Sequence, residues 1–173
     1  MGLRMHKFSA KIREWLFKFL GVHELCRLRN DDIYSHISHK LLNVHSVFGP
    51  AENLVVGHGV VLNNALINTV SGRVTLMAHA FFGHGVSVLT GTHDYHYTGF
   101  ERQVEVPGNG RDILIEEGVW ICSNATVLGP CVIGRNSVIA AGAVVTGNVD
   151  ANCIYAGVPA RKIKEIQPIQ PSI

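Results

Sequence analysis

Aliphatic residues recur at every sixth position between residues 115 and 145. These positions hold Ile115, Ile121, Val127, Ile133, Ile139 and Val145. Four residues after each comes a small or β-branched residue, namely Val119, Ala125, Cys131, Ser137, Ala143 and Val149. A period of six fits neither an amphipathic helix nor an isolated strand. It predicts a chain that coils around three flat faces, with one aliphatic side chain per face in the interior and the small residue at a tight corner.

The same phase extends upstream, although less regularly. Its members there are Leu76, Phe82 and Val88, with Ala80, Val86 and Thr92 as corner residues, and farther back Val44, Val56 and Leu62. Pro50 interrupts the pattern, and two extra residues enter near Ser71 and Gly72. We expect about five stacked coils between Val44 and Asp150, which bury one continuous aliphatic column.

Both ends of the chain are predicted to be helical. Apolar residues follow helical spacing near the N-terminus, at Phe8, Ile12, Trp15, Leu16 and Phe19, with lysines on another face. This amphipathic helix either caps an end of the coil or packs on a neighbouring subunit, or residues 1–20 make peripheral contact with a membrane. A short helix is expected from Ala160 to Ile166. The predicted boundaries are helical segments over residues 1–43, the coil over 44–158, and a C-terminal helix and tail over 159–173.

Composition narrows the function classes. Hydrophobic residues make up 47% of the chain and charged residues 16%, which predicts one folded domain with apolar surface hidden between subunits. The net charge of +2, without a basic run interleaved with aromatics, excludes nucleic acid as a partner. No CxxC pair occurs among Cys26, Cys122, Cys131 and Cys153. With no apolar run of spanning length, the protein is expected to be cytoplasmic.

One large break interrupts the repeat, between His93 and Ile115. This excursion loop, placed at residues 94–114, carries rings and charged groups such as Tyr95, Phe100 and Arg102. A stretch of this length inside an otherwise economical coil is usually functional. Rings and charges together suit a saccharide, whose apolar face stacks while its hydroxyls need polar partners. Alternatively, the loop only clamps a neighbouring subunit.

Three stretches resemble the hexapeptide-repeat acyltransferases. They are residues 115–127 with their Val-Trp-Ile, residues 132–146, and residues 156–163 with Gly-Val-Pro-Ala-Arg. The chain is most similar to the sugar O-acetyltransferases of the galactoside and maltose type and of surface-polysaccharide synthesis. The resemblance implies an all-β, left-handed parallel β-helix, assembled as a homotrimer with active sites in the clefts between subunits. It also implies acetyl-CoA as co-substrate, a sugar or glycan hydroxyl as acceptor, and no required metal.

The resemblance also assigns roles around the reacting atoms. His93 matches the catalytic histidine, and imidazole suits a general base because its ordinary pKa lies near neutrality. Ser123 matches a residue that hydrogen-bonds near the thioester carbonyl and helps stabilise the oxyanion. Trp120 matches an aromatic residue lining the cleft, and Asn63 an asparagine that contacts the acceptor. Asp94 is a further candidate, either to orient the His93 imidazole or to contact the acceptor, although the residue next to His93 in an extended strand points to the opposite side.

The donor side is assigned in the same way. Ala141 and Thr146 match positions beside the pantetheine arm of coenzyme A. Arg161 and Lys164 match basic positions near its adenine end, where cations pair with phosphates. Gly147 stands where the family has a lysine, so one phosphate contact is in doubt. None of the cysteines resembles an acyl-carrying nucleophile, and direct transfer in a ternary complex is expected.

Three alternative functions stay open. An N-acetyltransferase of nucleotide or amino sugars would use the same donor. A γ-class carbonic anhydrase shares the coil, and His79 and His84 have the spacing of two of its zinc ligands, but Asn63 stands where another histidine is needed. The excursion after His93 and the presence of Trp120 favour the transferase. The third alternative is a non-catalytic coil that serves as an assembly surface.

Overall fold

The computed structural model describes residues 43–167 and residue 169. The chain divides into two units, Met1–Leu41 and Leu42–Ile173. The helical segments predicted for residues 1–43, including the membrane-contact prediction for residues 1–20, lie outside the described residues apart from position 43. All of the strands below belong to the second unit.

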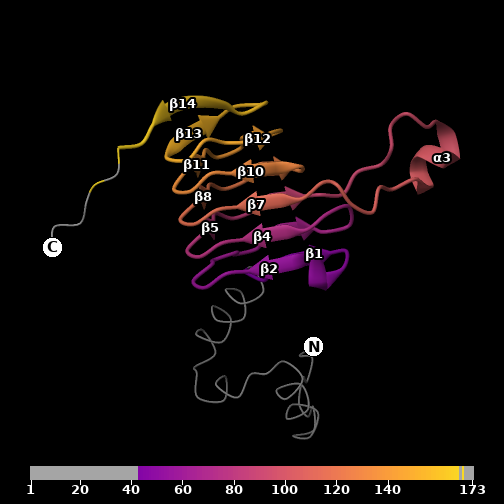
Figure 1. The fold of residues 1–173 in the computed structure, drawn as a ribbon, viewed down its shortest axis with the longest axis horizontal. Coiled ribbons are helices and arrows are strands. Elements are labelled where there is room, and N and C mark those ends of the chain that lie inside the picture. The colour runs from indigo at the N-terminus through magenta and orange to yellow at the C-terminus, as the bar shows by residue number, and fades with distance from the viewer. Residues whose placement is uncertain (1–42, 168, 170–173) are drawn as a thin grey trace, which may run out of the picture. The chain divides into compact units, whose positions relative to one another are not determined.

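Fourteen short strands form three sheets in the described region. The first sheet contains β1 (Ser46–Phe48), β3 (Leu66–Asn68), β6 (Ser87–Leu89), β9 (Thr126–Leu128) and β12 (Val144–Val145). The second contains β2 (Leu54–Val56), β4 (Val74–Leu76), β7 (Ile113–Ile115) and β10 (Cys131–Ile133). The third contains β5 (Phe81–Phe82), β8 (Trp120–Ile121), β11 (Val138–Ile139), β13 (Cys153–Ala156) and β14 (Arg161–Glu165). The chain visits the three sheets in rotation, so successive coils stack on one another (Figure 1).

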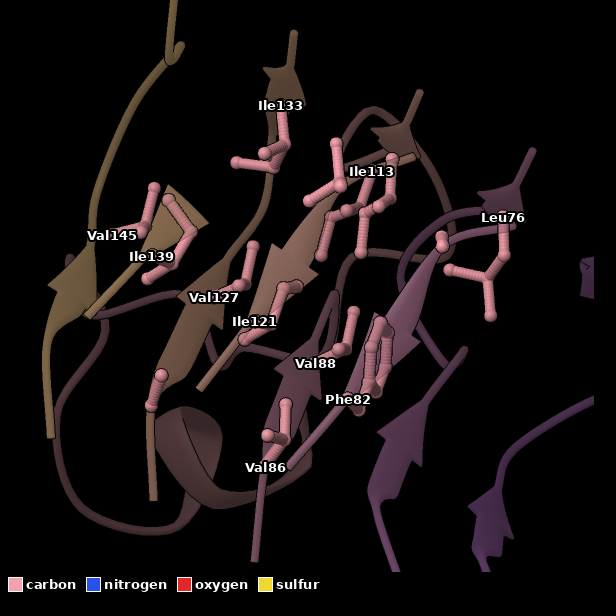
Figure 2. Close-up of a cluster of buried hydrophobic side chains, with 14 of the residues drawn as sticks. Leu76, Phe82, Val86, Val88, Ile113, Ile121, Val127, Ile133, Ile139 and Val145 are labelled. Carbon is pink, nitrogen blue, oxygen red and sulfur yellow. The ribbon is translucent and has the colours of Figure 1, made fainter. Parts of the chain in front are cut away.

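The repeat predicted from the sequence forms the core. All six Ile and Val positions from Ile115 to Val145 are buried, and so are all six corner residues that follow them. Figure 2 shows side chains from the three sheets, among them Phe82, Ile113 and Val127, in a shared interior. Two upstream expectations are wrong. Val44 and Val56 are 60% and 48% exposed, because they belong to the first described coil, which has a stacked neighbour on one side only.

At two of the three corners of the coil, a residue with a left-handed backbone conformation precedes the small inward residue. Gly118, Asn124, Asn136 and Gly142 all have positive φ angles, between 55° and 68°. Glycine adopts this left-handed conformation without steric penalty, and asparagine tolerates it better than most residues. These two corners therefore depend on a Gly or Asn directly before the small inward residue, whereas Cys131 and Val149, at the third corner, follow Pro130 and Asn148.

Extra residues gather at one corner, between the first and second sheets. In the regular part of the stack, Thr126 of β9 and Cys131 of β10 begin their strands five residues apart (131 − 126). The equivalent separation is eight residues from β1 to β2 (54 − 46) and from β3 to β4 (74 − 66), and 26 residues from β6 to β7 (113 − 87). We call this the loop-bearing corner. It contains the 3-10 helix η2 (Ala51–Asn53), the turn at residues 69–73 and the excursion loop.

The excursion projects sideways from the stack and carries the helix α3 (Gly99–Val104) (Figure 1). Arg102 braces it from within, because its guanidinium donates to the carbonyl oxygens of Tyr97 (2.7 Å) and Tyr95 (3.1 Å). The last two residues of the predicted loop 94–114 lie in β7 instead.

The short helix predicted after Ala160 is wrong. Residues Arg161–Glu165 form β14, which pairs with β13 and is the only antiparallel strand of the described region. The pairing covers the edge of β13, whose backbone N–H and C=O groups would otherwise lack partners. Five residues with a single central Ile163 do not distinguish a helix from a strand by periodicity.

Candidate active site

His93 lies on the loop-bearing corner, four residues after β6 ends at Leu89. Its side chain is exposed and lines a cavity of about 440 Å³. The other residues around this cavity are Phe48, Asn68, Val70, Gly91, Thr92 and Val106. Phe48, Val70 and Val106 supply its apolar lining, and the volume falls in the range of small-molecule sites. An imidazole in this position can reach a bound hydroxyl.

Asp94 makes its hydrogen bonds to other residues of the excursion. Its carboxylate oxygen Oδ1 accepts a hydrogen bond from the backbone N–H of His96 (2.9 Å), and its own N–H donates to the carbonyl of Glu105 (3.0 Å). Among the described residues, no hydrogen bond joins Asp94 to the His93 imidazole. The role predicted for Asp94 beside the acceptor stays a prediction.

Ser123 and Ala141 lie next to each other on a different corner, between the third and first sheets. The N–H of Gly142 donates to the carbonyl of Ser123 (3.0 Å), so the coil of Ala141 stacks directly on that of Ser123. On its other side, the Ser123 hydroxyl accepts a hydrogen bond from the backbone N–H of His84 (3.2 Å). This corner therefore forms a column of stacked turns with a half-buried hydroxyl in it.

Asn63 occupies the same kind of corner, in the first described coil. Its φ angle is 47°, and its amide nitrogen Nδ2 donates to the carbonyl of Phe82 (2.6 Å) in the next coil. This bond gives Asn63 a structural role at the turn. Its predicted contact with the acceptor stays a prediction.

Trp120 lies on the outer face of the third sheet and is 44% exposed. Its ring stacks on that of Phe81 in the preceding coil, with centroids 5.6 Å apart and planes inclined by 14°. The residues in register with Trp120 on successive strands are Val138, Ile154 and Lys164. Paired residues on neighbouring strands project to the same face. These residues form a column on the outer face of the third sheet, in which the backbone of Lys164 lies three strand spacings, or roughly 14 Å, from that of Trp120.

A β-bulge brings Arg161 onto the same face as Lys164. Residues three apart in a regular strand point to opposite sides. The register of β14 shifts by one residue between Ile154 and Tyr155, so Arg161 pairs with Ala156 and Lys164 with Ile154. Ala156 and Ile154 are two residues apart and share a face. These two cations, which were expected on a C-terminal helix, therefore lie on one face of a bulged strand.

Arg161 also lies beside Thr146. Both line a small cavity of about 160 Å³, together with Gly147, Asn148 and Tyr155. A Cβ atom added to Gly147 would meet nothing within 4 Å, so this side of the cavity is open. The structure thus brings together two of the four residues predicted to contact coenzyme A.

Within one chain, His93 does not meet Trp120 or Ser123. His93 follows β6 at the loop-bearing corner, whereas Ser123 precedes β9 at the opposite end of the first-sheet strands. At about 3.3 Å per residue, these two corners are separated by on the order of 15–20 Å. The candidate site therefore consists of two halves on two edges of the coil.

The described cysteines near these halves are poor nucleophiles. Burial raises the pKa of the Cys131 thiol to about 11, although the positive charge of Arg111 opposes the shift. Burial also raises the pKa of the Cys122 thiol next to Ser123. Because the thiolate is the nucleophilic form, neither residue is activated for acyl transfer.

Sequence reasoning missed three residues that shape the candidate site. Phe81 stacks on Trp120, but the excursion places these residues 39 positions apart (120 − 81), which hides their equivalence in the repeat. Asn68 lines the His93 cavity, and Arg111 bonds to the strand end before His93 (Nε to the Thr90 carbonyl, 2.8 Å). Neither polar residue carries a periodic signal.

The described region also bears on the zinc-binding alternative and on the search for a membrane-spanning segment. Among residues 43–167 and 169, no three His, Cys, Asp or Glu side chains gather in a group that could hold a metal ion. His79 and His84 lie on different corners, before and after β5. No helix of this part of the chain has the length and apolar character needed to cross a bilayer.

Comparison with known proteins identifies the repeat. Residues 112–147 match the profile of the family described as bacterial transferase hexapeptide (six repeats). A hexapeptide-repeat acetyltransferase of Vibrio cholerae, solved with acetyl coenzyme A, superimposes with a TM-score of 0.61 at 25% identity, covering 93% of this chain and 92% of that one. A galactoside acetyltransferase in complex with coenzyme A has a TM-score of 0.65 at 24% identity, covering 90% and 80%, and therefore shows the fold alone. The resemblance to hexapeptide-repeat acyltransferases is confirmed.

Curated relatives match over shorter stretches. A 2,3,4,5-tetrahydropyridine-2,6-dicarboxylate N-acetyltransferase of Staphylococcus aureus is 38% identical over 64 residues, which is 37% of this chain and 27% of that protein. The chain spans between 24% and 57% of the length of the first curated relatives that it matches. Three of these four relatives and both structural neighbours carry the name acetyltransferase, two of the relatives as putative ones.

Proposed function

We propose that this chain, which carries the repeats of the hexapeptide transferase family, is an acetyl-CoA-dependent O-acetyltransferase acting on a sugar or glycan hydroxyl. The observation that carries the proposal is the position of His93. Its exposed imidazole lines an apolar cavity at the point where the chain leaves the coil. Family resemblance and the acetyl-CoA and coenzyme A complexes of the structural neighbours support the choice of donor.

The reaction is a direct transfer. The His93 imidazole accepts the proton of the acceptor hydroxyl while the oxygen attacks the thioester carbonyl carbon. The Ser123 hydroxyl donates to the carbonyl oxygen as it becomes an oxyanion. The intermediate then collapses, the C–S bond breaks, and the departing thiolate takes the proton from the imidazolium. The products are an O-acetyl ester and free coenzyme A.

The donor follows the edge formed by the third sheet and its corner with the first. The thioester lies at Ser123, the pantetheine arm passes Ala141, and the phosphates reach Arg161 and Lys164. The outer column from Trp120 to Lys164 and the cavity shared by Thr146 and Arg161 support this direction. A path of roughly 14 Å from Trp120 to Lys164 fits an extended ligand better than a compact one.

A second copy of the chain completes the site. Because His93 and Ser123 lie at opposite ends of the first-sheet strands, His93 of one subunit acts on a thioester held by Ser123 of its neighbour. Three copies related by a threefold axis would form three identical sites. We infer that the coil is the left-handed parallel β-helix that the family resemblance implies, and that the first sheet, with Phe48 65% and Leu66 43% exposed, contributes apolar contact surface.

The acceptor side is formed by the excursion. Tyr95 and Phe100 are 73% and 72% exposed, and the Arg102 brace holds the segment that carries them. Exposed rings on the segment that follows the base suit the apolar face of a sugar ring. A function in surface-polysaccharide synthesis in the cytoplasm, with the enzyme free or at the membrane surface, agrees with this acceptor.

An N-acetyltransferase is the second candidate, because an N-acetyltransferase is among the relatives with the highest local identity. An amine acceptor would use the same donor half-site and the same base. Assays with a sugar and its amino-sugar analogue distinguish O-acetyl transfer from N-acetyl transfer by the product that forms. Hydroxylamine cleaves an O-acetyl ester and leaves an amide intact.

The full chain should be assayed with acetyl-CoA against sugars, nucleotide sugars and glycan fragments, with free thiol as the readout. His93→Ala should lower kcat by roughly 10²–10⁴-fold and leave acetyl-CoA affinity nearly unchanged. His58→Ala is the matched control, since His58 is also exposed but lies on the corner between the second and third sheets. Half of the wild-type turnover in His93→Ala would overturn the assignment.

A further inference from the structure

We infer that Asn68 is a positioning residue for His93, which it holds through the backbone at the end of the preceding strand. The inference rests on the proposed function, because it gives His93 a catalytic task. Asn68 lies one coil away from His93 along the loop-bearing corner, and the two residues line the same cavity.

The Asn68 side chain bridges the two coils. Its carbonyl oxygen Oδ1 accepts hydrogen bonds from the backbone N–H groups of Val70 (2.9 Å) and Gly91 (3.1 Å). Gly91 packs so closely that a Cβ atom there would lie 2.5 Å from the Asn68 amide nitrogen. The single oxygen thus fixes the chain two residues before His93, at a position where any larger residue would displace the Asn68 side chain.

Thr90 anchors the same strand end through every polar group that it has. Its N–H (3.1 Å) and its hydroxyl (2.9 Å) both donate to the backbone carbonyl of Asn68, and the hydroxyl also accepts the N–H of Ser71 (3.2 Å). Its carbonyl accepts a hydrogen bond from Arg111 Nε (2.8 Å) on the return limb of the excursion. Thr90 is fully buried, so these bonds are shielded from water.

The other flank of His93 is held by the excursion. The N–H of Asp94 donates to the carbonyl of Glu105 (3.0 Å). His93 therefore lies between two anchors, Gly91 and Asp94, although it projects into an open cavity. A base must meet its proton within hydrogen-bond reach, and a displacement of about 1 Å can lower turnover about 10²-fold. Loss of the Gly91 anchor would allow such a displacement.

The test compares Asn68→Ala with Asn68→Asp. Alanine removes the oxygen, whereas aspartate keeps an oxygen acceptor for both N–H groups. Glu116→Ala is the matched control, because Glu116 Oε2 also accepts a backbone N–H from the next coil, that of Arg135 (2.8 Å), but on the corner between the second and third sheets. We expect kcat to fall roughly 10- to 100-fold in Asn68→Ala, with unchanged KM for acetyl-CoA, and to recover in Asn68→Asp.

Either of two kinetic outcomes would overturn the inference. One is a kcat in Asn68→Ala no lower than in Glu116→Ala, which would reduce Asn68 to a structural residue. The other is a failure of Asn68→Asp to recover turnover although it folds with wild-type melting temperature. Amide hydrogen exchange gives a readout without turnover, and exchange at residues 90–94 should accelerate in Asn68→Ala only. If the wild type transfers no acetyl group, the proposed function fails. Unchanged exchange in Asn68→Ala would separately show that Asn68 does not hold the backbone beside His93.

Discussion

The Ser123 hydroxyl accepts the backbone N–H of His84 across 3.2 Å, so the coil that precedes Ser123 sets the orientation of its Oγ. An oxygen that accepts on one side directs its own proton elsewhere. Here the proton can point toward a thioester carbonyl. Gly83 allows the coil of His84 to lie this close to Ser123, because a Cβ atom at position 83 would lie 2.6 Å from the Ser123 hydroxyl.

Ser123→Ala should therefore lower kcat by roughly 10²–10³-fold, as loss of one oxyanion donor does in other acyl-transfer enzymes. Ser87→Ala is the control, because Ser87 is also a half-buried serine, at the start of β6, and its hydroxyl makes no hydrogen bond within the described part of the chain. Steady-state rates with saturating acetyl-CoA decide the question. Equal rates for the two variants would show that another donor stabilises the oxyanion.

Replacement of Arg161 and Lys164 by alanine should weaken coenzyme A binding more than it weakens binding of dephospho-coenzyme A or a pantetheine thioester. The reason is that the bulge places both cations on one face, where they can pair with phosphates. Lys162→Ala serves as the control, since Lys162 already pairs with Asp150 (3.3 Å) and Glu165 (3.0 Å). Calorimetry with the three donors measures the difference, and an equal loss for all of them would place the cations elsewhere.

The fold could be predicted from the sequence to the extent that periodic burial determines it. Every sixth residue from Ile115 to Val145 is buried because each hexapeptide occupies one face of the coil. The C-terminal strand could not be predicted in this way, since Arg161–Glu165 has one apolar residue and pairs only because β13 offers an open edge. Val44 was misassigned because a pattern of aliphatic residues does not indicate where the stack ends.

The candidate site was predictable only where a motif marks it. His93 stands out by resemblance and by the break in the repeat that follows it. Asn68 and Arg111 act through single hydrogen bonds to backbone atoms of another coil, and their partners are 23 and 21 residues away. Such contacts depend on the register between coils, which the insertions at the loop-bearing corner shift without a sequence signal.

Gly147→Lys should strengthen coenzyme A binding. Gly147 stands where the family has a lysine, it lines the cavity of Thr146 and Arg161, and the space around it is open. A lysine there adds one cation near the donor phosphates. Titration should show a lower Kd for coenzyme A, with a smaller change for a pantetheine thioester. A Kd that does not move would indicate that the phosphates pass on another side of Arg161.

The Cys131 thiol should make stability depend on pH in the alkaline range. Its pKa is raised by burial to about 11 in the folded chain, from an ordinary value of 9.0. The folded state therefore retains its proton longer than the unfolded state does. This contribution is fully present below pH 9 and is lost as the pH rises through 11, by about 2–3 kcal/mol in total.

Cys131→Ala should remove that loss without disturbing the corner, because Ala125 and Ala143 occupy equivalent positions. Urea unfolding of both proteins at pH 8, 9, 10 and 11 measures the difference between their free energies of unfolding. The gap between wild type and variant should narrow or reverse as the pH rises. A gap that stays constant would show that the thiol is not the titrating group.

Co-assembly of two inactive variants tests whether the site is shared between subunits. His93→Ala retains Ser123, and Ser123→Ala retains His93. If His93 of one subunit acts on a thioester held by Ser123 of its neighbour, then a mixed trimer contains some interfaces where both residues are intact. For random mixing of equal amounts, such interfaces make up about a quarter of all sites.

The mixture, unfolded and refolded together, should recover about a quarter of wild-type turnover, whereas each variant refolded alone should stay nearly inactive. A site formed within one chain predicts no recovery at any mixing ratio, because every chain would lack one of the two residues. Mixing without refolding is the control, since subunits that do not exchange cannot complement one another.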